Sequence, residues 1–165
     1  MLEKFYPQYR FNSIADIKID FFKKHHIKNV ILDIDNTLVP YTVAKPTDTA
    51  MRFINNLREE GINVCLVSNN NRRRVETFNS DLKLHTRHRA AKPLTRRLRQ
   101  ALDTIHALPS NSAIIGDQLF TDVWCGNRMK MTTILVEPIE NKENLFFKFK
   151  RNLEKKILRK LDNRR

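Results

Sequence analysis

The chain has 165 residues, 41% of them hydrophobic and 30% charged, which fits one soluble globular domain with a real core and excludes a disordered chain. The sequence holds 31 Lys and Arg against 18 Asp and Glu, a net charge of +13. It has no run of about 18 apolar residues that could span a membrane, and no secretory signal. Two cysteines and three glycines exclude a disulfide scaffold, a four-thiolate zinc site and glycine-rich nucleotide loops. We therefore expect a cytoplasmic protein.

The first half of the chain predicts helices and strands in alternation. Asn12 or Ser13 can cap a helix, because short polar side chains bind the free amides of a first helical turn. Gly61 is expected to end a later helix, since glycine tolerates the left-handed backbone there. The predicted elements are a helix with the apolar face Ile14, Ile17, Phe21 and Phe22, a strand over 30–35, a helix over 48–60 capped by Asp48, and a strand over Asn63–Val67.

The second half continues the same alternation. The predicted elements are a basic helix from Arg72, a short strand over 82–84, a helix over 94–108 with the apolar stripe Leu98, Leu102, Ile105 and Leu108, and strands over 113–115 and Thr132–Val136. Continuous apolar strands that alternate with helices are typical of a mainly parallel sheet covered on both faces. The predicted fold class is therefore α/β.

The positive charge is concentrated in two blocks. Residues 72–99 hold ten basic and two acidic residues, and residues 141–165 hold ten basic and three acidic residues. Two such blocks favour an anionic partner, which could be nucleic acid, an acidic membrane surface or a polyphosphorylated substrate. The alternative is a solvated surface without a partner.

Polar residues follow the predicted strands where the strands end. Asp33 and Asp35 follow the first long strand, Ser68 and Asn69 the second, and Asp117 the third. Because the carboxyl ends of parallel strands form the ligand-binding edge of such a sheet, we expect these side chains to converge. Converging carboxylates repel one another unless a cation neutralises them, and an all-oxygen set of donors suits Mg²⁺. Taken singly, each Asp could instead cap a turn or form an ion pair.

Ser68 and Lys92 complete this set. The hydroxyl of Ser68 can hydrogen-bond a phosphoryl oxygen, although serine is also a common helix cap. Lys92 precedes Pro93, which favours an extended backbone from which the side chain can reach inward. A single lysine in a basic run is otherwise most often a surface residue.

Four motifs together resemble those of the haloacid dehalogenase (HAD) superfamily of phosphatases. They are D-x-D-x-T from Asp33 to Thr37, Ser68 after the next strand, Lys92-Pro93 ahead of a helix, and G-D-x-x-x-x-D from Gly116 to Asp122. Over about residues 6–136 the sequence is most similar to subclass IIIA, in the YqeG-like group that includes mitochondrial phosphatidylglycerophosphate phosphatases. The resemblance implies a Rossmann-like three-layer sandwich. The chain between its motifs is too short for a cap domain, so we expect an open site.

The resemblance also implies roles for individual residues. Asp33 would be the nucleophile that forms an aspartyl-phosphate, and Asp35 the general acid and base, with its backbone carbonyl on Mg²⁺. Asp117 would bind the metal together with Asp33, and Asp122 would assist directly or through water. Lys92 would act in catalysis by neutralising charge. The implied phosphate-binding residues are Thr37, Ser68, Asn69 and Lys92.

The end of the chain predicts a separate element. We expect a phosphatase core over residues 1–140, including the N-terminal helix, and a basic amphipathic helix over 141–165. One face of that helix carries apolar residues every three or four positions, namely Phe146, Phe149, Leu153, Ile157 and Leu161. Such a helix can lie in the interface of an anionic membrane or dock on the domain's own core.

The leading hypothesis is a Mg²⁺-dependent phosphomonoesterase that dephosphorylates phosphatidylglycerophosphate on the inner face of a membrane, to which it binds peripherally. One alternative is a phosphatase of a soluble metabolite, a phosphoprotein or a nucleic-acid end. Another is a non-catalytic module that binds RNA or ribosomes. Residues 72–99 hold a single aromatic residue, Phe78, among their basic residues, which argues against stacking on nucleic acid, the less favoured partner. The oligomeric state is left open.

Overall fold

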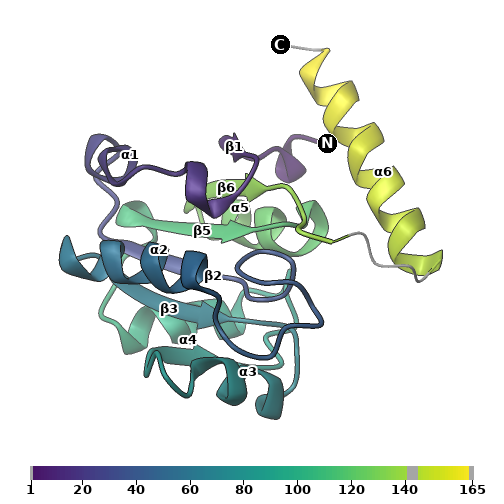
Figure 1. Ribbon diagram of the computed structural model, residues 1–165. Helices are drawn as coiled ribbons and strands as arrows, with labels where there is room; N and C mark the ends of the chain where they lie inside the picture. The colour runs from purple at the N-terminus through teal and green to yellow at the C-terminus, as the bar shows by residue number, and fades with distance from the viewer. Residues whose placement is uncertain (1, 141–144, 164–165) are drawn as a thin grey trace.

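The computed structural model describes residues 2–140 and 145–163, without the side chains of 145–147. A six-stranded, wholly parallel sheet forms its centre, in the order β1-β6-β5-β2-β3-β4 (Figure 1). The strands are β1 (Tyr9–Phe11), β2 (Asn29–Leu32), β3 (Asn63–Val67), β4 (His85–Arg87), β5 (Ser112–Gly116) and β6 (Thr132–Val136). This confirms the α/β fold with a mainly parallel sheet.

Helices connect the strands. The α-helices are α1 (Ile19–Lys24), α2 (Asp48–Glu59), α3 (Arg72–Asn79), α4 (Arg96–Thr104), α5 (Trp124–Arg128) and α6 (Leu145–Asp162). Shorter turns of 3₁₀-helix are η1 (Glu3–Phe5), η2 (Ile14–Asp16) and η3 (Pro109–Asn111), and one π-helical turn, η4, spans Leu119–Val123. Among the described residues, no helix has the length and apolarity needed to cross a bilayer.

The core has two halves, one on each face of the sheet, because successive side chains of a strand point to opposite faces. Val30 and Leu32 of β2 pack in the cluster that α1, α2 and α3 cover. Ile31, between them, packs in the cluster that α4 and α5 cover. The result is the three-layer sandwich that the sequence predicts.

Several predicted boundaries are wrong, for local reasons. The helix expected from Ser13 is two short helices: Ser13 and Asp16 form a capping box around η2, and the chain is extended at Ile17 before α1 begins. Thr47, rather than Asp48, caps α2. The strand expected over 30–35 ends at Leu32, because the next residues turn.

The other differences lie at the edges of the sheet and in one helix. The strand expected over 82–84 is found at His85–Arg87, since Asn79 holds both backbone polar groups of Leu84 with its side chain (2.8 and 2.9 Å). The helix expected over 94–108 is shorter, Arg96–Thr104, and Leu108 is exposed. The edge strand β1 was not predicted; its three residues are too few to show a period.

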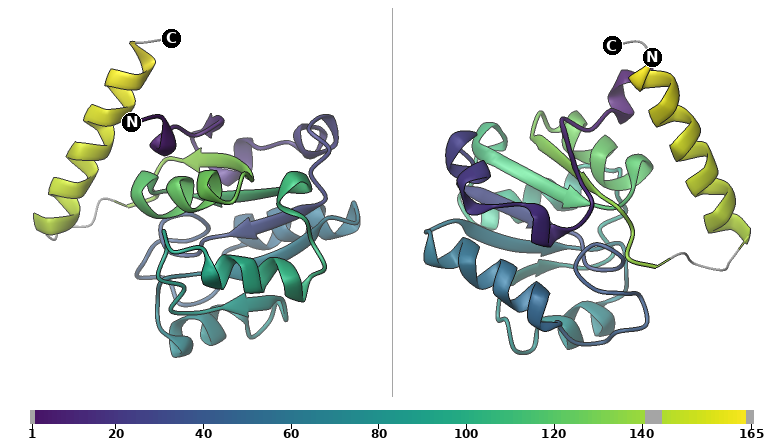
Figure 2. Two further views of the ribbon diagram at one scale, coloured as in Figure 1. Left: turned by 180° about the vertical axis from the view of Figure 1, so that it is seen from behind. Right: turned by 45° about the horizontal axis from the view of Figure 1, so that its top comes forward.

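Helix α6 runs beside the N-terminal segment (Figures 1 and 2). Asp162 pairs with Arg10 (2.6 Å), and Ile157 and Leu158 pack against a small cluster of Leu119, Val123 and Leu135. The predicted apolar stripe is divided: Leu161 is buried, whereas Phe149 and Leu153 are 69% and 42% exposed. The side chain of Phe146 lies outside the described part.

Candidate active site

Three carboxylates meet at the carboxyl ends of neighbouring strands. Asp33 follows β2, Asp117 follows β5, and Asp122 lies in η4. One carboxylate oxygen from each lies within 4.8 Å of the other two, and all three residues are buried. The structure therefore brings together three of the four residues expected to hold a metal.

Lys92 joins two of these carboxylates. Its Nζ lies 2.7 Å from Oδ1 of Asp33 and 2.6 Å from Oδ1 of Asp122, and it also donates to the carbonyl of Val67 (2.7 Å). Asn69 fixes the backbone of Lys92: its Oδ1 accepts from the Lys92 amide (2.7 Å), and its Nδ2 donates to the Lys92 carbonyl (3.2 Å). The side chain of Asn69 is thus engaged in placing the lysine.

The approach of Asp122 depends on Gly116. A Cβ atom at position 116 would overlap the side chain of Asp122, so only glycine fits there. Asp122 then accepts a hydrogen bond from the Gln118 amide (3.2 Å), which closes the turn. The π-helical turn η4 places Asp122 five residues after Asp117 on the same side of the site.

Asp35 lines the same hollow but is not one of the three clustered carboxylates. Arg74 of α3 pairs with its Oδ1 (2.9 Å), and Nδ2 of Asn70 donates to its Oδ2 (3.0 Å). Only its backbone carbonyl is left for the metal role that the resemblance implies. The turn that directs Asp35 depends on Asn36, whose φ of 63° lies in the left-handed region that asparagine tolerates.

Thr37 and Ser68 lie beside these groups. Thr37 is buried and its hydroxyl donates to Oδ1 of Asp117 (3.4 Å). Ser68 is buried as well, and its hydroxyl accepts from the amide of Asn70 (3.1 Å). Ser68 lines the same hollow as Asp33, whereas Thr37 is in contact with Asp117 and is not part of the wall.

Burial and mutual repulsion govern the charges of the site. Burial raises the pKa of Asp33 to about 7; Lys92 opposes this rise, while Asp122 and Asp117 add to it. Burial also raises the pKa of Asp117, against the effect of Arg151. For Lys92, burial works against the ammonium, but the carboxylates of Asp122 and Asp33 outweigh it and raise the pKa. Each nearby positive charge therefore favours the ionised form of these carboxyl groups.

Helix α6 supplies residues that sequence reasoning did not single out. Arg151 forms an ion pair with Asp117 and, at 3.1 Å, with the buried Glu154. Lys150 donates to the side-chain oxygen of Gln118 (2.5 Å). In the sequence, Lys150, Arg151 and Arg74 are members of the two basic blocks. Nothing in the pattern distinguishes them from the other basic residues of those blocks.

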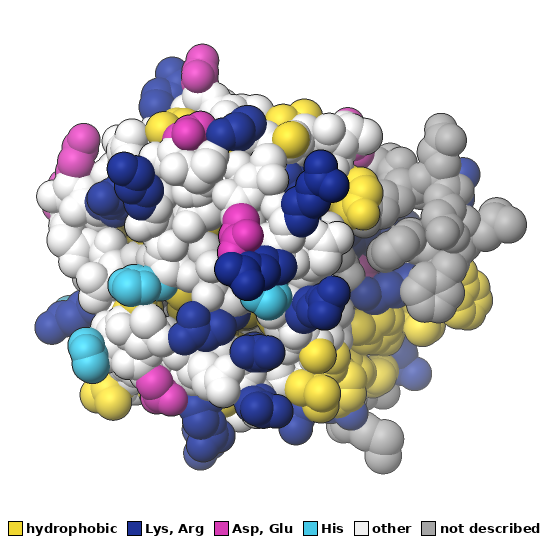
Figure 3. Space-filling model, turned by 90° about the horizontal axis from the view of Figure 1, so that it is seen from below, with side chains coloured by type: hydrophobic (Ala, Val, Ile, Leu, Met, Phe, Trp, Pro, Cys, Tyr) yellow, Lys and Arg dark blue, Asp and Glu magenta, His cyan; other side chains and the backbone are white. Residues whose placement is uncertain are grey.

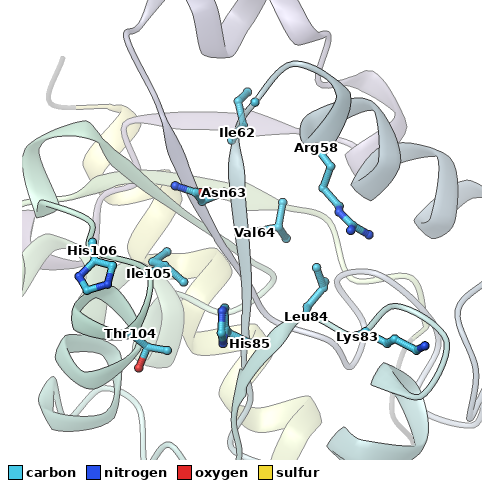
Figure 4. Close-up of a pocket in the computed structure, with 11 residues that line it drawn as sticks. Arg58, Ile62, Asn63, Val64, Lys83, Leu84, His85, Thr104, Ile105 and His106 are labelled. Carbon is cyan, nitrogen blue, oxygen red and sulfur yellow. The ribbon is translucent and has the colours of Figure 1, made fainter.

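A hollow of about 330 Å³ opens over this group of residues. Its walls are formed by Asp33, Asp35, Tyr41, Ser68, Asn69, Asn70, Lys92, Gln118, Thr121 and Lys150. A larger hollow of about 580 Å³ lies at the opposite end of β3 and β4 (Figure 4), where Arg58, Lys83, His85 and His106 bring basic groups but no carboxylate lines it. Of these two hollows, the first combines carboxylates with cations.

The donor set fits Mg²⁺. Asp33, Asp117 and Asp122 offer oxygen atoms alone, with no thiolate or imidazole, and hard divalent cations prefer such ligands. Lys92 and Arg151 offset part of the repulsion among these three buried carboxylates, and a divalent cation would offset more of it.

Comparisons with known proteins identify the family of the chain. The family described as mitochondrial PGP phosphatase matches residues 2–140. The chain is 35% identical over 159 residues to a protein of Bacillus subtilis (strain 168) described as probable phosphatase YqeG, covering 96% of this chain and 92% of that protein.

Solved structures share the fold. A HAD-superfamily hydrolase from Ehrlichia chaffeensis aligns with a TM-score of 0.58 at 16% identity, covering 80% of this chain and 98% of that one. The cobalt-bound deoxy-D-mannose-octulosonate 8-phosphate phosphatase from Haemophilus influenzae aligns with a TM-score of 0.54 at 16% identity, covering 83% and 90%. On the match over residues 2–140 and the 35% identity, this chain, which has the fold of HAD-superfamily hydrolases, is a phosphatase and belongs to the mitochondrial PGP phosphatase family.

Proposed function

We propose that the protein is a Mg²⁺-dependent phosphomonoesterase that converts phosphatidylglycerophosphate to phosphatidylglycerol at an anionic membrane surface. The observation that carries the proposal is the buried group in which Lys92 bridges Asp33 and Asp122 beside Asp117. A nucleophile, a fixed cation and a metal-binding pair of carboxylates are the parts that phosphoryl transfer to an aspartate needs.

In the first step, a carboxylate oxygen of Asp33 attacks phosphorus, and the bond between phosphorus and the ester oxygen breaks. Lys92 holds Oδ1 of Asp33 (2.7 Å), which orients the carboxylate and leaves its other oxygen for the attack. Asp35 gives a proton to the departing alkoxide. The product of this step is an aspartyl-phosphate on Asp33.

In the second step, water attacks the phosphorus of the aspartyl-phosphate while Asp35 takes its proton. Inorganic phosphate leaves and the carboxylate of Asp33 is restored. Arg74 and Asn70 hold Asp35 between the two steps, and Ser68 lies where its hydroxyl can bind a phosphoryl oxygen. Mg²⁺, held by Asp33, Asp117 and the Asp35 carbonyl with Asp122 assisting, would supply positive charge to the phosphoryl oxygens.

Three features support a lipid substrate at a membrane. The family that matches the chain is described by its PGP phosphatase activity. The connections around the hollow hold no cap domain in the described residues, so a headgroup presented on a large surface can reach Asp33. The net charge of +13 favours an anionic surface. The corresponding location is cytoplasmic and peripheral, on the inner face of the membrane.

The test is a panel of phosphomonoesters assayed for released phosphate. We expect Mg²⁺-dependent turnover of phosphatidylglycerophosphate in vesicles to exceed that of nucleotide, sugar and peptide phosphates, and chelation to abolish it. Preference for a soluble phosphomonoester would overturn the lipid substrate but leave the phosphatase activity established. Undiminished turnover in excess chelator would overturn the metal's role.

A further inference from the structure

Exposed large hydrophobic side chains are gathered at one end of the molecule. In the part of the chain that the structure describes there are six: Tyr41, Leu94, Leu108, Ile139, Phe149 and Leu153. Tyr41, Leu94 and Ile139 follow β2, β4 and β6, at the carboxyl ends of the strands, and Phe149 and Leu153 belong to α6. Leu108 alone, between α4 and β5, lies at the opposite end. Five of the six thus surround the end of the sheet that holds the hollow.

The exposed flank of α6 adjoins the hollow. The helix turns its Arg151, Glu154 and Leu161 toward the body. Phe149 and Leu153 are four residues apart, and Lys150 and Leu153 three apart, so each pair shares a side of the helix. Lys150 lines the hollow and binds Gln118. The apolar flank is therefore continuous with the mouth of the active site, where Tyr41 forms another part of the wall.

Basic residues accompany these apolar side chains. Arg72, Arg73, Arg89 and Lys148 are exposed on α3, on the β4–α4 connection and on α6. The connections after β3 and β4, over 68–71 and 88–95, contain no acidic residue. The exposed Glu137 and Glu140 flank Ile139, so the surroundings of that side chain are acidic and differ from those of the other four. Seen from below (Figure 3), hydrophobic side chains gather on the side of α6, with Lys and Arg side chains spread around them.

We propose that this surface, defined by Tyr41, Leu94, Phe149 and Leu153 with Arg72, Arg73, Arg89 and Lys148, docks on an anionic lipid bilayer with the hollow facing the lipid. Exposed apolar side chains flanked by cations are typical of interfacial binding, in which the apolar groups enter the headgroup region and the cations meet anionic lipids. A second copy of this chain carries the same net charge of +13, and these cations would repel it. The proposal rests on the proposed function only for the identity of the substrate.

Docking of this kind explains the position of Lys150. Lys150 lines the hollow together with Asp33, and its ammonium donates to the side-chain oxygen of Gln118 (2.5 Å). The Lys150 side chain is partly buried, and this burial lowers its pKa. A lipid phosphomonoester that enters from the bilayer must pass this cation before it reaches the carboxylates.

The experiment measures co-sedimentation of the full chain with vesicles that contain no phosphomonoester: phosphatidylcholine alone, and equal parts of phosphatidylcholine and phosphatidylglycerol. The double variant Phe149→Ser/Leu153→Ser tests the apolar flank, with Leu108→Ser as its control at the opposite end. Arg73→Gln/Arg89→Gln tests the cations, with Lys24→Gln/Lys28→Gln as a control of equal charge. Circular dichroism checks that each variant is folded.

We expect the wild type to bind only the anionic vesicles. The double serine variant should bind them at least about tenfold more weakly, the double glutamine variant about thirtyfold more weakly, and both controls like the wild type. Equal losses in test and control variants would show a nonspecific effect of charge and overturn the surface, as would wild-type binding that survives both test variants. A wild-type dimer that the serine substitutions separate, without vesicle binding, would show that a second copy covers the flank and overturn the proposal too. Docking without lipid phosphatase activity would refute the substrate and leave the surface standing.

Discussion

Asp117 lies between two parts of the molecule that are built differently. On the sheet side, Asp33, Lys92 and Asp122 are buried, and the ammonium of Lys92 joins the two carboxylates at 2.7 and 2.6 Å. On the α6 side, Arg151 approaches Asp117 from a helix that rests on a few apolar residues and ion pairs, with one flank exposed. The sheet side can position reacting groups, whereas the exposed flank of α6 is available for contact with a partner. Substitutions should therefore have large effects on chemistry on one side and mainly affect docking and stability on the other.

The largest effect is expected for Asp33→Asn. The amide is almost the same size but a poor nucleophile, so phosphatase activity should fall by about 10⁴-fold or more. Released phosphate from an aryl phosphate is the measurement, and Asp16→Asn, at an exposed turn, is the control. Substantial activity in Asp33→Asn would contradict the assignment of Asp33 as the nucleophile.

Next in size is Lys92→Met. Asp33 and Asp122 would lose their shared cation, so we expect a loss of about 10²–10³-fold in kcat and a fall in the free energy of unfolding of about 3 kcal/mol or more. Urea unfolding and steady-state kinetics measure the two effects, with the exposed Lys130→Met as control. A variant as stable as the wild type would show that the bridge is not what holds these carboxylates.

A smaller but specific effect concerns metal binding. Mg²⁺ should raise the unfolding temperature of the wild type, because it binds only the folded arrangement of carboxylates. In Asp117→Asn this rise should largely disappear, whereas Asp162→Asn on α6 should keep it. Differential scanning calorimetry with and without Mg²⁺ gives the comparison. An equal rise in Asp117→Asn would exclude this residue as a ligand.

The smallest effects are expected on α6. Leu161→Ala should lower the free energy of unfolding by about 2 kcal/mol, since it opens a gap in a buried contact, and Leu153→Ala, on the exposed flank, should leave it nearly unchanged. Chemical denaturation measures both. Equal costs would mean that the exposed flank of α6 is covered in solution.

The sequence predicted the sheet side well and the α6 side poorly. Apolar strands of four or five residues and the polar residues after them located Asp33, Ser68 and Asp117, because parallel strands bring their carboxyl ends together. Local patterns could not show that the side chain of Asn79 binds Leu84, so that β4 begins only at His85. They also could not show that Arg74 pairs with Asp35, or that the three-residue strand β1 forms one edge of the sheet.

For α6, periodicity predicted an amphipathic helix but not its partner. Its docked face includes Arg151 and the buried Glu154, polar residues that a hydrophobic pattern assigns to solvent. Removing the whole segment after Asn141 would therefore disturb Asp117 as well as any membrane contact. Point substitutions on the exposed flank separate these two roles.

The most direct test of the account is to trap the phosphorylated enzyme. The Asp35→Asn variant is mixed with Mg²⁺ and an aryl phosphate, whose good leaving group needs no proton in the first step, while the second step still lacks its base. After an acid quench, peptide mass spectrometry should find the phosphoryl group on Asp33, and the Asp33→Asn/Asp35→Asn double variant should carry none. A phosphoryl group on another residue, or phosphate release with Asp33 never labelled, would contradict the assignment of Asp33 as the nucleophile.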